Sequence, residues 1–359
     1  MSAEHTLGER YAARRRERLQ FNVGQRDFDN LQEAYGLLCA SRVWDMTLPW
    51  LEEQRSIATL RRFHRAGFGF VSATLQDFPP SMAGIRRGIE HFTQLAAGEQ
   101  DWLCVAQRYE DIDLGQRAGK LVLGLNVQDA VQIGTELSRV RELWNYGIRH
   151  MQLSYNLRNQ VADGCAEATD TGLSRFGRQL VPEMNRVGMI VDCSHVGHQS
   201  SLEAVELSSA PVIFSHSGAY GICAHIRNVQ DDQIRACAEK GGVIGAVGIG
   251  GFIGDPLARA ESVFRHIDYM VNLVGPEHVG LGTDYVEDMI SVWDAIRGQK
   301  DLGWPDPTGT QITEGRCFEP EQLPELVAIM LSHGYPHSSI QGILGENFCR
   351  VYRGGRDNP

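Results

Sequence analysis

Short, almost continuous apolar runs recur along this chain, and longer amphipathic segments separate them. Three examples are GMIVDCSH at residues 188–195, PVIFSHS at 211–217 and GGVIGAVGI at 241–249. A strand with one face in water alternates apolar and polar residues, whereas an unbroken apolar strand is buried on both faces. Such strands, separated by helices, are typical of βαβ units and predict a parallel sheet covered by helices.

The spacing of these runs predicts a barrel. Eight strands are expected at residues 43–47, 68–75, 121–126, 150–155, 189–194, 211–215, 243–248 and 278–283, with a weaker ninth at 103–106. Helices are expected at residues 199–207, 230–240, 257–274 and 320–334, the last of them closing the chain. About eight βα units in ~300 residues favour a TIM-like (β/α)8 barrel in the α/β class over an open doubly wound sheet. No glycine-rich nucleotide-binding pattern follows any strand, which leaves the nucleotide-binding form of the open sheet little support.

Length and composition bound the remaining possibilities. We expect an N-terminal helical extension over residues 1–40 and a single barrel domain over residues 41–359. The net charge of −11 disfavours nucleic acid as a partner, because the field of the protein repels phosphates. No apolar run reaches the ~18 residues of a membrane span, and no apolar segment follows the three arginines at 14–16. We therefore expect no membrane association, a cytoplasmic location, and eight reduced, mostly buried cysteines.

Three polar side chains stand where predicted strands end. His195 and His216 end two neighbouring apolar runs, and Asp284 follows the strand at 278–283. A parallel barrel gathers its active site at the carboxyl ends of its strands, so these side chains are expected to converge. Imidazole and carboxylate are ordinary ligands of zinc, which predicts a metal site. A purely structural hydrogen bond is the alternative for each histidine.

Arg227 lies in HIRNVQDDQ, just before a helix that is expected to begin near Asp231 and Asp232. Acidic residues suit the first turn of a helix, so the two aspartates are interpreted as helix starters. A guanidinium on this face of the barrel is suited to bind a carboxylate through two hydrogen bonds, and a surface arginine is the alternative. Cap, loop or surface positions are expected for His198, His64, His91, His266, His333 and His337.

Five segments carry a family resemblance. In order, VDCSHVGHQS, PVIFSHSGAYGICAHIRNVQDD, GGVIGAV, HVGLGTDY and ILGENFCRVY resemble the membrane (renal) dipeptidase family of zinc peptidases, and the similarity runs over about residues 45–352. The resemblance implies a (β/α)8 barrel with two zinc ions that hydrolyses dipeptides. It places His195 and His216 as ligands of one zinc and Asp284 as a ligand of the other. It also implies that Arg227 holds the terminal carboxylate of the substrate.

The chain departs from the family pattern at three strands. The first strand of the family carries D-G-H-x-D, but here VWDMTLPW keeps only Asp45. Asn126, in LGLNVQDA, stands at the position of the glutamate that bridges both zinc ions, and Tyr155, in LSYN, replaces a histidine. A neutral amide does not offset the charge of two zinc ions as a bridging carboxylate does. We therefore expect at most one zinc ion, on His195 and His216 with Asp284 or water, and an empty site is the alternative.

These features predict a dipeptidase-like metallohydrolase for a small dipeptide or another amino-acid-derived carboxylate. Asp284 is expected to act as a base or further ligand, and Tyr155 to donate to the developing oxyanion. Arg227, Asn126 and Tyr155 are expected to contact the substrate. Ordinary dipeptides are expected to be poor substrates, and a homodimer is left open. A metal-free acid–base enzyme for elimination or epimerisation, and a non-catalytic binding homologue, are the alternatives.

Overall fold

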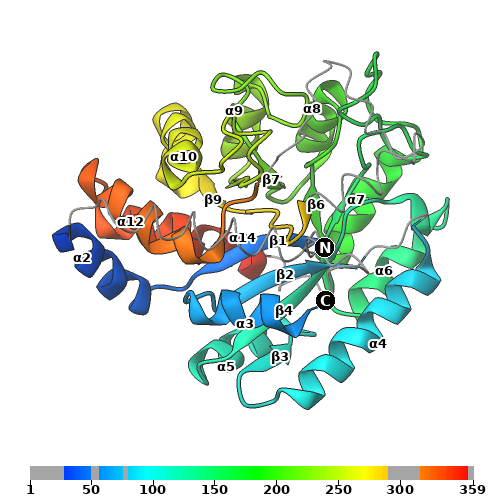
Figure 1. The fold of residues 1–359 in the computed structure, drawn as a ribbon. Helices are drawn as coiled ribbons and strands as arrows, with labels where there is room; N and C mark the ends of the chain where they lie inside the picture. The colour runs from blue at the N-terminus through cyan, green and yellow to red at the C-terminus, as the bar shows by residue number, and fades with distance from the viewer. Residues whose placement is uncertain (1–27, 50–55, 76–79, 290–315, 355–359) are drawn as a thin grey trace, which may run out of the picture.

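The predicted barrel is present. The structure is a computed structural model that describes residues 28–49, 56–75, 80–289 and 316–354. One parallel sheet runs in the order β1-β2-β4-β5-β6-β7-β8-β9, with β3 paired beside β4 (Figure 1). The strands are β1 Trp44–Pro49, β2 Phe70–Thr74, β3 Leu103–Val105, β4 Leu121–Val127, β5 Ile148–Gln152, β6 Ile190–Asp192, β7 Ile213–Ser217, β8 Val243–Ala246 and β9 Val279–Leu281.

A side chain joins the two ends of the sheet. β1 and β9 are in contact, but among the described residues no backbone ladder joins them. The carboxylate of Asp45, on β1, accepts hydrogen bonds from the backbone N–H of Thr283 at 2.9 Å and from its hydroxyl. Thr283 lies just beyond the end of β9. Asp45 therefore helps to hold the seam of a nearly closed barrel, in place of a ladder.

Helices surround this sheet (Figure 1). They are α2 Phe28–Cys39, α3 Ile57–Arg65, α4 Met82–Gly98, α5 Tyr109–Arg117, α6 Ser138–Asn145, α7 Gly177–Val187, α8 His198–Leu207, α9 Asp231–Glu239, α10 Ala260–Val274, α12 Leu323–Ser332, α13 His337–Gln341 and α14 Asn347–Gly354, with short 3-10 or π turns at Val131–Ile133, Pro276–His278, Pro320–Gln322 and Gly342–Glu346. The expectation that a helix at 320–334 closes the chain is wrong, because α13 and α14 follow it. Most of the predicted extension, residues 1–27, lies outside the described residues.

The interior of the barrel changes from apolar to polar along the strands. Near the amino ends, Trp44, Phe70 and Ile213 form a buried cluster with Phe348 and Tyr352, both from α14. Side chains two residues apart on a strand point to the same face. The next inward positions on β2, β6 and β7 are therefore Ser72, Asp192 and Ser215, all fully buried. This change of polarity places the buried polar groups toward the carboxyl ends of the strands.

Two predicted boundaries shift, with consequences for the site. The strand expected at 150–155 runs instead over Ile148–Gln152, because Ile148 already pairs with Leu125 of β4. Tyr155 consequently lies in the loop after β5 rather than on the strand. The helix expected at 257–274 begins only at Ala260, because the side chain of Asp255 accepts hydrogen bonds from the N–H groups of Leu257 and Arg259 and holds a turn there.

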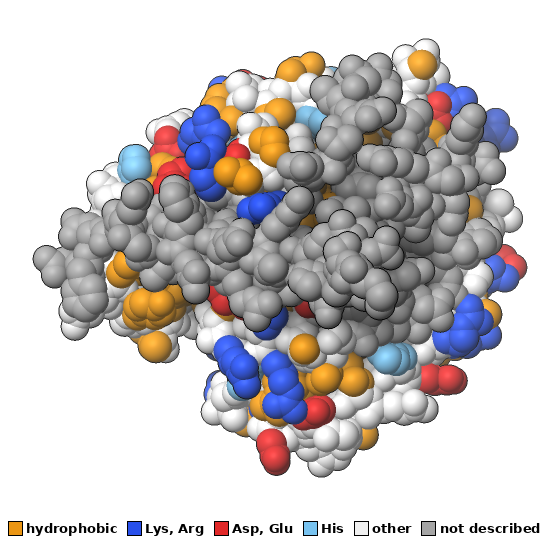
Figure 2. Space-filling view, in the orientation of Figure 1, with side chains coloured by type: hydrophobic (Ala, Val, Ile, Leu, Met, Phe, Trp, Pro, Cys, Tyr) orange, Lys and Arg blue, Asp and Glu red, His pale blue; other side chains and the backbone are white. Residues whose placement is uncertain are grey.

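Other features of the fold concern the surface and the thiols. Within the described ranges, no helix is both long enough and apolar enough to cross a membrane. All eight cysteines lie in the described part of the chain and are free thiols, of which Cys39 is exposed and only half are fully buried. On the face seen in Figure 2, basic and acidic side chains are interspersed rather than gathered into one basic patch.

Candidate functional site

The two predicted histidine ligands meet. His195 follows β6, His216 lies within β7, and their Nε2 atoms are 2.9 Å apart. Both side chains are buried, His195 with 3% and His216 with 0% of their surface exposed. His195 has a backbone φ of +64°, a conformation that is uncommon for residues other than glycine. The local backbone therefore turns this imidazole back toward its neighbour on β7.

The hydrogen bonds of His195 place its proton. Nδ1 of His195 lies 2.7 Å from Oδ1 of Asn156, and the thiol of Cys165 also donates to that oxygen. An amide oxygen only accepts, so Nδ1 of His195 must carry the hydrogen. In the neutral ring, Nε2 is then left with a lone pair, and this lone pair faces His216.

The partners of His216 lead to the same result. Ser215 donates its hydroxyl proton to Asp192 at 2.5 Å. Since a serine has only one such proton, its oxygen can only accept from Nδ1 of His216, which lies 2.8 Å away. Thr47 also contacts this Nδ1, at 2.9 Å. His216 therefore also has its hydrogen on Nδ1 and a lone pair on Nε2.

Two lone pairs that face each other at 2.9 Å repel unless a cation or a proton lies between them. Burial lowers the pKa of both His195 and His216 well below the usual histidine range, and the nearby charge of Arg227 lowers it further. A shared proton is therefore unfavourable near neutral pH. The separation is less than twice the ~2.0–2.1 Å length of a Zn–N bond, so one ion can bond to both nitrogens. The donor set fits a divalent metal.

Asp284 is the third side chain of the predicted metal site. No cluster of three or more His, Cys, Asp or Glu side chains that could hold a metal occurs among the described residues. Asp284 follows β9 with a φ of +53° and is buried. Burial raises the pKa of its carboxyl to about 7, although the charge of Arg227 lowers it, and Asp45 raises it further. The assignment of Asp284 as a metal ligand therefore stays a prediction.

Asn126 belongs to a hydrogen-bonded network inside the barrel, in which its own direct partners, Ser72 and Thr74, are uncharged. Its amide donates to the hydroxyl of Ser72 at 2.8 Å and accepts from Thr74 at 3.0 Å. The same Ser72 hydroxyl lies 2.9 Å from Nε2 of His150, whose Nδ1 is 3.2 Å from Asp192. Asn126 therefore uses both ends of its amide within the barrel. Its assignment to substrate binding stays a prediction.

Tyr155 and Arg227 flank the histidine pair. The ring of Tyr155 stacks on that of His195, with centroids 4.1 Å apart. Arg227 has only 3% of its surface exposed, so the surface alternative is wrong. Its Nη2 donates to the backbone oxygen of His216 at 3.3 Å, and its guanidinium lies 5.6 Å from the ring centre of Phe252. The cation is thus held against the backbone of one predicted ligand.

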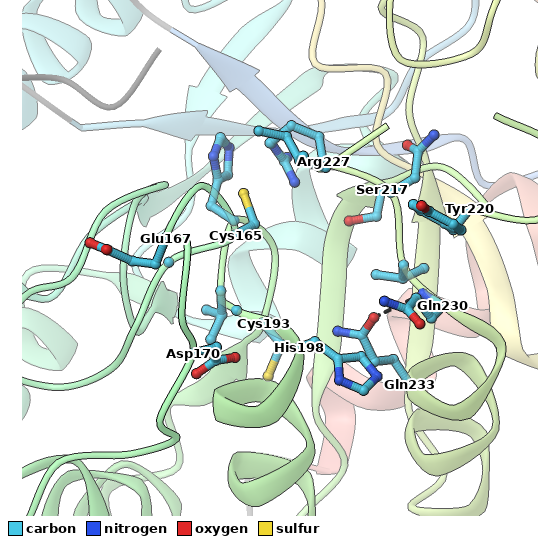
Figure 3. A pocket seen from close by; sticks show the side chains of 17 residues that line it. Cys165, Glu167, Asp170, Cys193, His198, Ser217, Tyr220, Arg227, Gln230 and Gln233 are labelled. Carbon is cyan, nitrogen blue, oxygen red and sulfur yellow. Dashed lines mark hydrogen bonds between the residues drawn. The ribbon is translucent and has the colours of Figure 1, made fainter. Parts of the chain in front are cut away.

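A cavity of about 280 Å³ opens beside these groups (Figure 3). Its lining includes Cys165, His195, Ser217, Tyr220 and Arg227. The last residue of β7 and the loops after β5, β6 and β7 supply these residues, as expected for the carboxyl end of a parallel barrel. The cavity is close to the lower limit of ~300 Å³ for small-molecule sites. It therefore suits a small substrate.

Sequence reasoning missed several supporting residues. Asp192 was visible as the single charged residue in GMIVDCSH, and its carboxylate accepts from Ser194, Ser215 and His150. Burial alone raises the pKa of Asp192, but the bond from His150 and the other donors outweigh it, so that this pKa is lowered. His150 was detectable from the polar residues at 150 and 152 within a strand.

Two other histidine predictions have different outcomes. His266 is not at the surface but fully buried in α10, where Nδ1 accepts from the N–H of Ala219 at 2.9 Å. It packs on the loop after β7, which the sequence pattern alone did not reveal. His198 is partly exposed and pairs with Asp232 at 2.8 Å.

A family model decides the relationship. The model described as membrane dipeptidase (peptidase family M19) matches residues 70–303, more than half of the chain. The chain belongs to this family. The predicted recognition is therefore confirmed, and the barrel and the paired histidines belong to a membrane dipeptidase family member.

Relatives of this membrane dipeptidase family member extend the comparison. An uncharacterized dipeptidase of Schizosaccharomyces pombe is 32% identical over 243 residues, which are 66% of this chain and 53% of that protein. The chain thus spans about half the length of this curated relative. A solved amidohydrolase from Pseudomonas aeruginosa is 26% identical, with a TM-score of 0.81 over 90% of this chain and 98% of that one.

A third comparison concerns the fold alone. A metallo peptidase from Rhodobacter sphaeroides, solved with a phosphinate mimic of the dipeptide L-Ala-D-Ala, is 20% identical. Its TM-score is 0.70 over 87% of this chain and 99% of that one. At this identity the likeness shows a shared barrel and nothing about the ligand of this family member.

Proposed function

We propose that this chain is a metal-dependent hydrolase of the dipeptidase type, which uses one divalent ion to cleave a small substrate with a free carboxylate. The observation that carries the proposal is the pair of Nε2 lone pairs of His195 and His216, 2.9 Å apart in a buried site. Membership of a peptidase family supports the hydrolase class. The solved amidohydrolase from Pseudomonas aeruginosa, 26% identical to this chain, points in the same direction.

One ion is proposed rather than two. His195 and His216 would hold it, and the region beside them is occupied by the side chains of Ser72, Thr74 and Asn126. Those three side chains are an amide and two hydroxyls. None of them carries a negative charge, so they supply no anionic ligand for a second divalent ion. When bound, a single divalent ion makes water nucleophilic near neutral pH and polarises a carbonyl. Zinc is the proposed metal because imidazole is among its preferred ligands.

The residues of this chain would divide the remaining work. Arg227 binds and orients the substrate carboxylate, since its guanidinium is buried and offers N–H groups in a fixed fork. Asp284, with a pKa of about 7, is suited to take a proton from water and return it to the leaving amine. Tyr155, held on the face of His195, would donate to the carbonyl oxygen as charge develops there.

Metal-free acid–base chemistry has less support. It would need a proton between His195 and His216, yet burial and Arg227 both lower their pKa values. Ordinary dipeptides such as Ala–Ala are still expected to be poor substrates. Loss of one oxyanion donor alone typically costs about 100- to 1,000-fold in rate, and this site lacks a second metal as well.

Hydrolysis by paired histidine variants tests the proposal. The full-length protein, supplied with zinc, is assayed against a panel of dipeptides and of their C-terminal amides. We expect measurable cleavage of at least one free-carboxylate substrate, loss of that cleavage in His195→Ala, and its retention in His198→Ala. His198 lines the outer part of the same cavity, so a second control, His337→Ala, changes an exposed histidine of α13 that pairs with Glu33 and should also retain cleavage. Equal turnover in the wild type and in His195→Ala would overturn the proposal.

A further inference from the structure

Two buried hydrogen-bond donors in the cavity have no acceptor. Nε of Arg227 and Oγ of Ser217 each lie out of reach of solvent and find no partner in the part of the chain that the structure describes. The exposed surface of the two residues is 3% and 1%. An unsatisfied buried donor is unfavourable, and among the described residues these are the only two with such an atom that line the cavity.

The two donors border the same space. Both residues line the cavity of about 280 Å³. Nη2 of Arg227 bonds to the backbone oxygen of His216, the residue directly before Ser217. Figure 3 shows the side chains of Ser217 and Arg227 around this cavity, with the thiol of Cys165 beside Arg227. A single ligand group in the cavity would lie beside both residues and would reach the two donors once their side chains turn toward it.

Both unpaired groups are hydrogen-bond donors. Nε of arginine can only donate, and the serine hydroxyl carries one proton to donate. Arg227 also forms no ion pair with a carboxylate within 4.0 Å among the described residues, although its charge acts on Asp284 and lowers the pKa of that carboxyl. The missing partner is thus an acceptor with negative charge. A carboxylate supplies two oxygens and about four acceptor positions, whereas an amide supplies one oxygen and adds unwanted donors.

We infer that Ser217 is a specificity-determining residue, whose hydroxyl binds the substrate carboxylate together with Arg227. The inference rests on the proposed function, because it names the group that makes the cavity select free carboxylates over amides. The serine hydroxyl donates a hydrogen bond to one oxygen of the carboxylate. The guanidinium supplies charge and the second contact. A C-terminal amide would present its NH2 group to one of two donors and lose that bond.

Binding of a matched pair of probes tests this inference. Alanyl-alanine and alanyl-alaninamide are titrated into full-length protein of known metal content, and the dissociation constants are measured by calorimetry or NMR. We expect the wild type to prefer the free carboxylate by at least tenfold. Ser217→Ala should weaken binding of alanyl-alanine by about tenfold or more, as for a hydrogen bond to a charged group, and leave the amide unchanged. Ser217→Cys, with a weaker donor of similar shape, should fall between the two.

A control variant separates donor loss from loss of volume. Val229 lines the same cavity and contributes no side-chain donor, so Val229→Ala should keep the carboxylate preference. Wild-type preference in Ser217→Ala, or equal loss in Val229→Ala, would overturn the role of Ser217. These results do not depend on turnover. If the protein prefers carboxylates through Ser217 but holds no metal and cleaves nothing, the inference stands as a binding site and the proposed hydrolase function fails.

Discussion

Nε2 of His195 and Nε2 of His216 face each other at 2.9 Å, while each Nδ1 is bonded to an oxygen. The contact is favourable only with a cation between the rings. A metal that binds the folded chain and not the unfolded chain stabilises it by mass action, by about 2.7 kcal/mol at a hundred times Kd.

Added zinc should therefore raise the thermal unfolding midpoint of the chelator-treated protein. The same addition should leave the unfolding midpoint of His216→Ala unchanged, because that variant lacks one of the two nitrogens that would bind the ion. Differential scanning calorimetry with and without zinc provides the measurement. A shift of equal size in the variant would place the stabilising ion elsewhere in the protein.

Ser215 should control the metal affinity of His216 without touching the ion. Its oxygen accepts from Nδ1 of His216 and passes its own proton to Asp192, which fixes the ring and its tautomer. Residues that orient a metal ligand typically account for about 10- to 100-fold in affinity. Competition titration against a chromogenic chelator should show a loss of this size in Ser215→Ala. Ser201→Ala, which changes a buried serine on α8, is the control and should bind metal normally.

The seam between β1 and β9 should depend on the Thr283 hydroxyl. This hydroxyl and its own N–H both donate to the buried carboxylate of Asp45. Burial raises the pKa of Asp45 to about 6, against the opposing effect of these bonds, so the group is largely ionised at pH 7.5. Thr283→Val should reduce the free energy of unfolding by about 1.5–3 kcal/mol, the usual effect for a bond to a charged group. Urea unfolding of Thr283→Ser, which keeps the hydroxyl, should stay near the wild-type value.

His266 should make the protein acid-sensitive. Burial lowers its pKa to about 4 in the folded protein, against ~6.5 in the unfolded chain. The unfolded state therefore binds more protons between these two values, and stability falls as the pH decreases through 6.5. The contribution reaches about 2 kcal/mol at pH 5 and about 3 kcal/mol below pH 4.

A glutamine at this position isolates the effect of His266. Its amide can accept from the N–H of Ala219 and donate to the backbone oxygen of Ile253, as the imidazole does. His266→Gln should show a smaller loss of stability between pH 7.5 and 5 than the wild type, by urea unfolding at both pH values. Identical pH dependence in the two proteins would show that His266 is not the group responsible.

The sequence predicted the barrel well because strands that are buried on both faces consist almost entirely of apolar residues, and such runs are visible in the sequence. Each of the eight predicted strands overlaps one of the strands β1, β2 and β4–β9, and the weaker ninth corresponds to β3. The predicted start of the strand at Ile148–Gln152 was two residues too far along the chain, because Arg149 and His150 interrupt its apolar run. The seam bond between Asp45 and Thr283 was hidden, since the two residues are 238 positions apart.

The site was only partly predictable for a physical reason. His195, His216 and Arg227 stand at strand ends or on the loops that follow, where the topology of a parallel barrel brings chain segments together. The contacts of Asp192, Ser215 and Asn156 depend on rotamers and register, which no spacing rule encodes. Asp284 shares the predicted end of the barrel, but its side chain is not part of a metal-binding cluster among the described residues.

Metal content is the most direct test of one ion on a histidine pair. Full-length wild type, His195→Ala and His198→Ala are purified without chelator, exchanged into zinc-containing buffer, desalted and analysed by elemental analysis. We predict about one divalent ion per chain in the wild type and in His198→Ala, and almost none in His195→Ala. Two ions per wild-type chain, or equal metal content in His195→Ala and the wild type, would contradict the one-metal account.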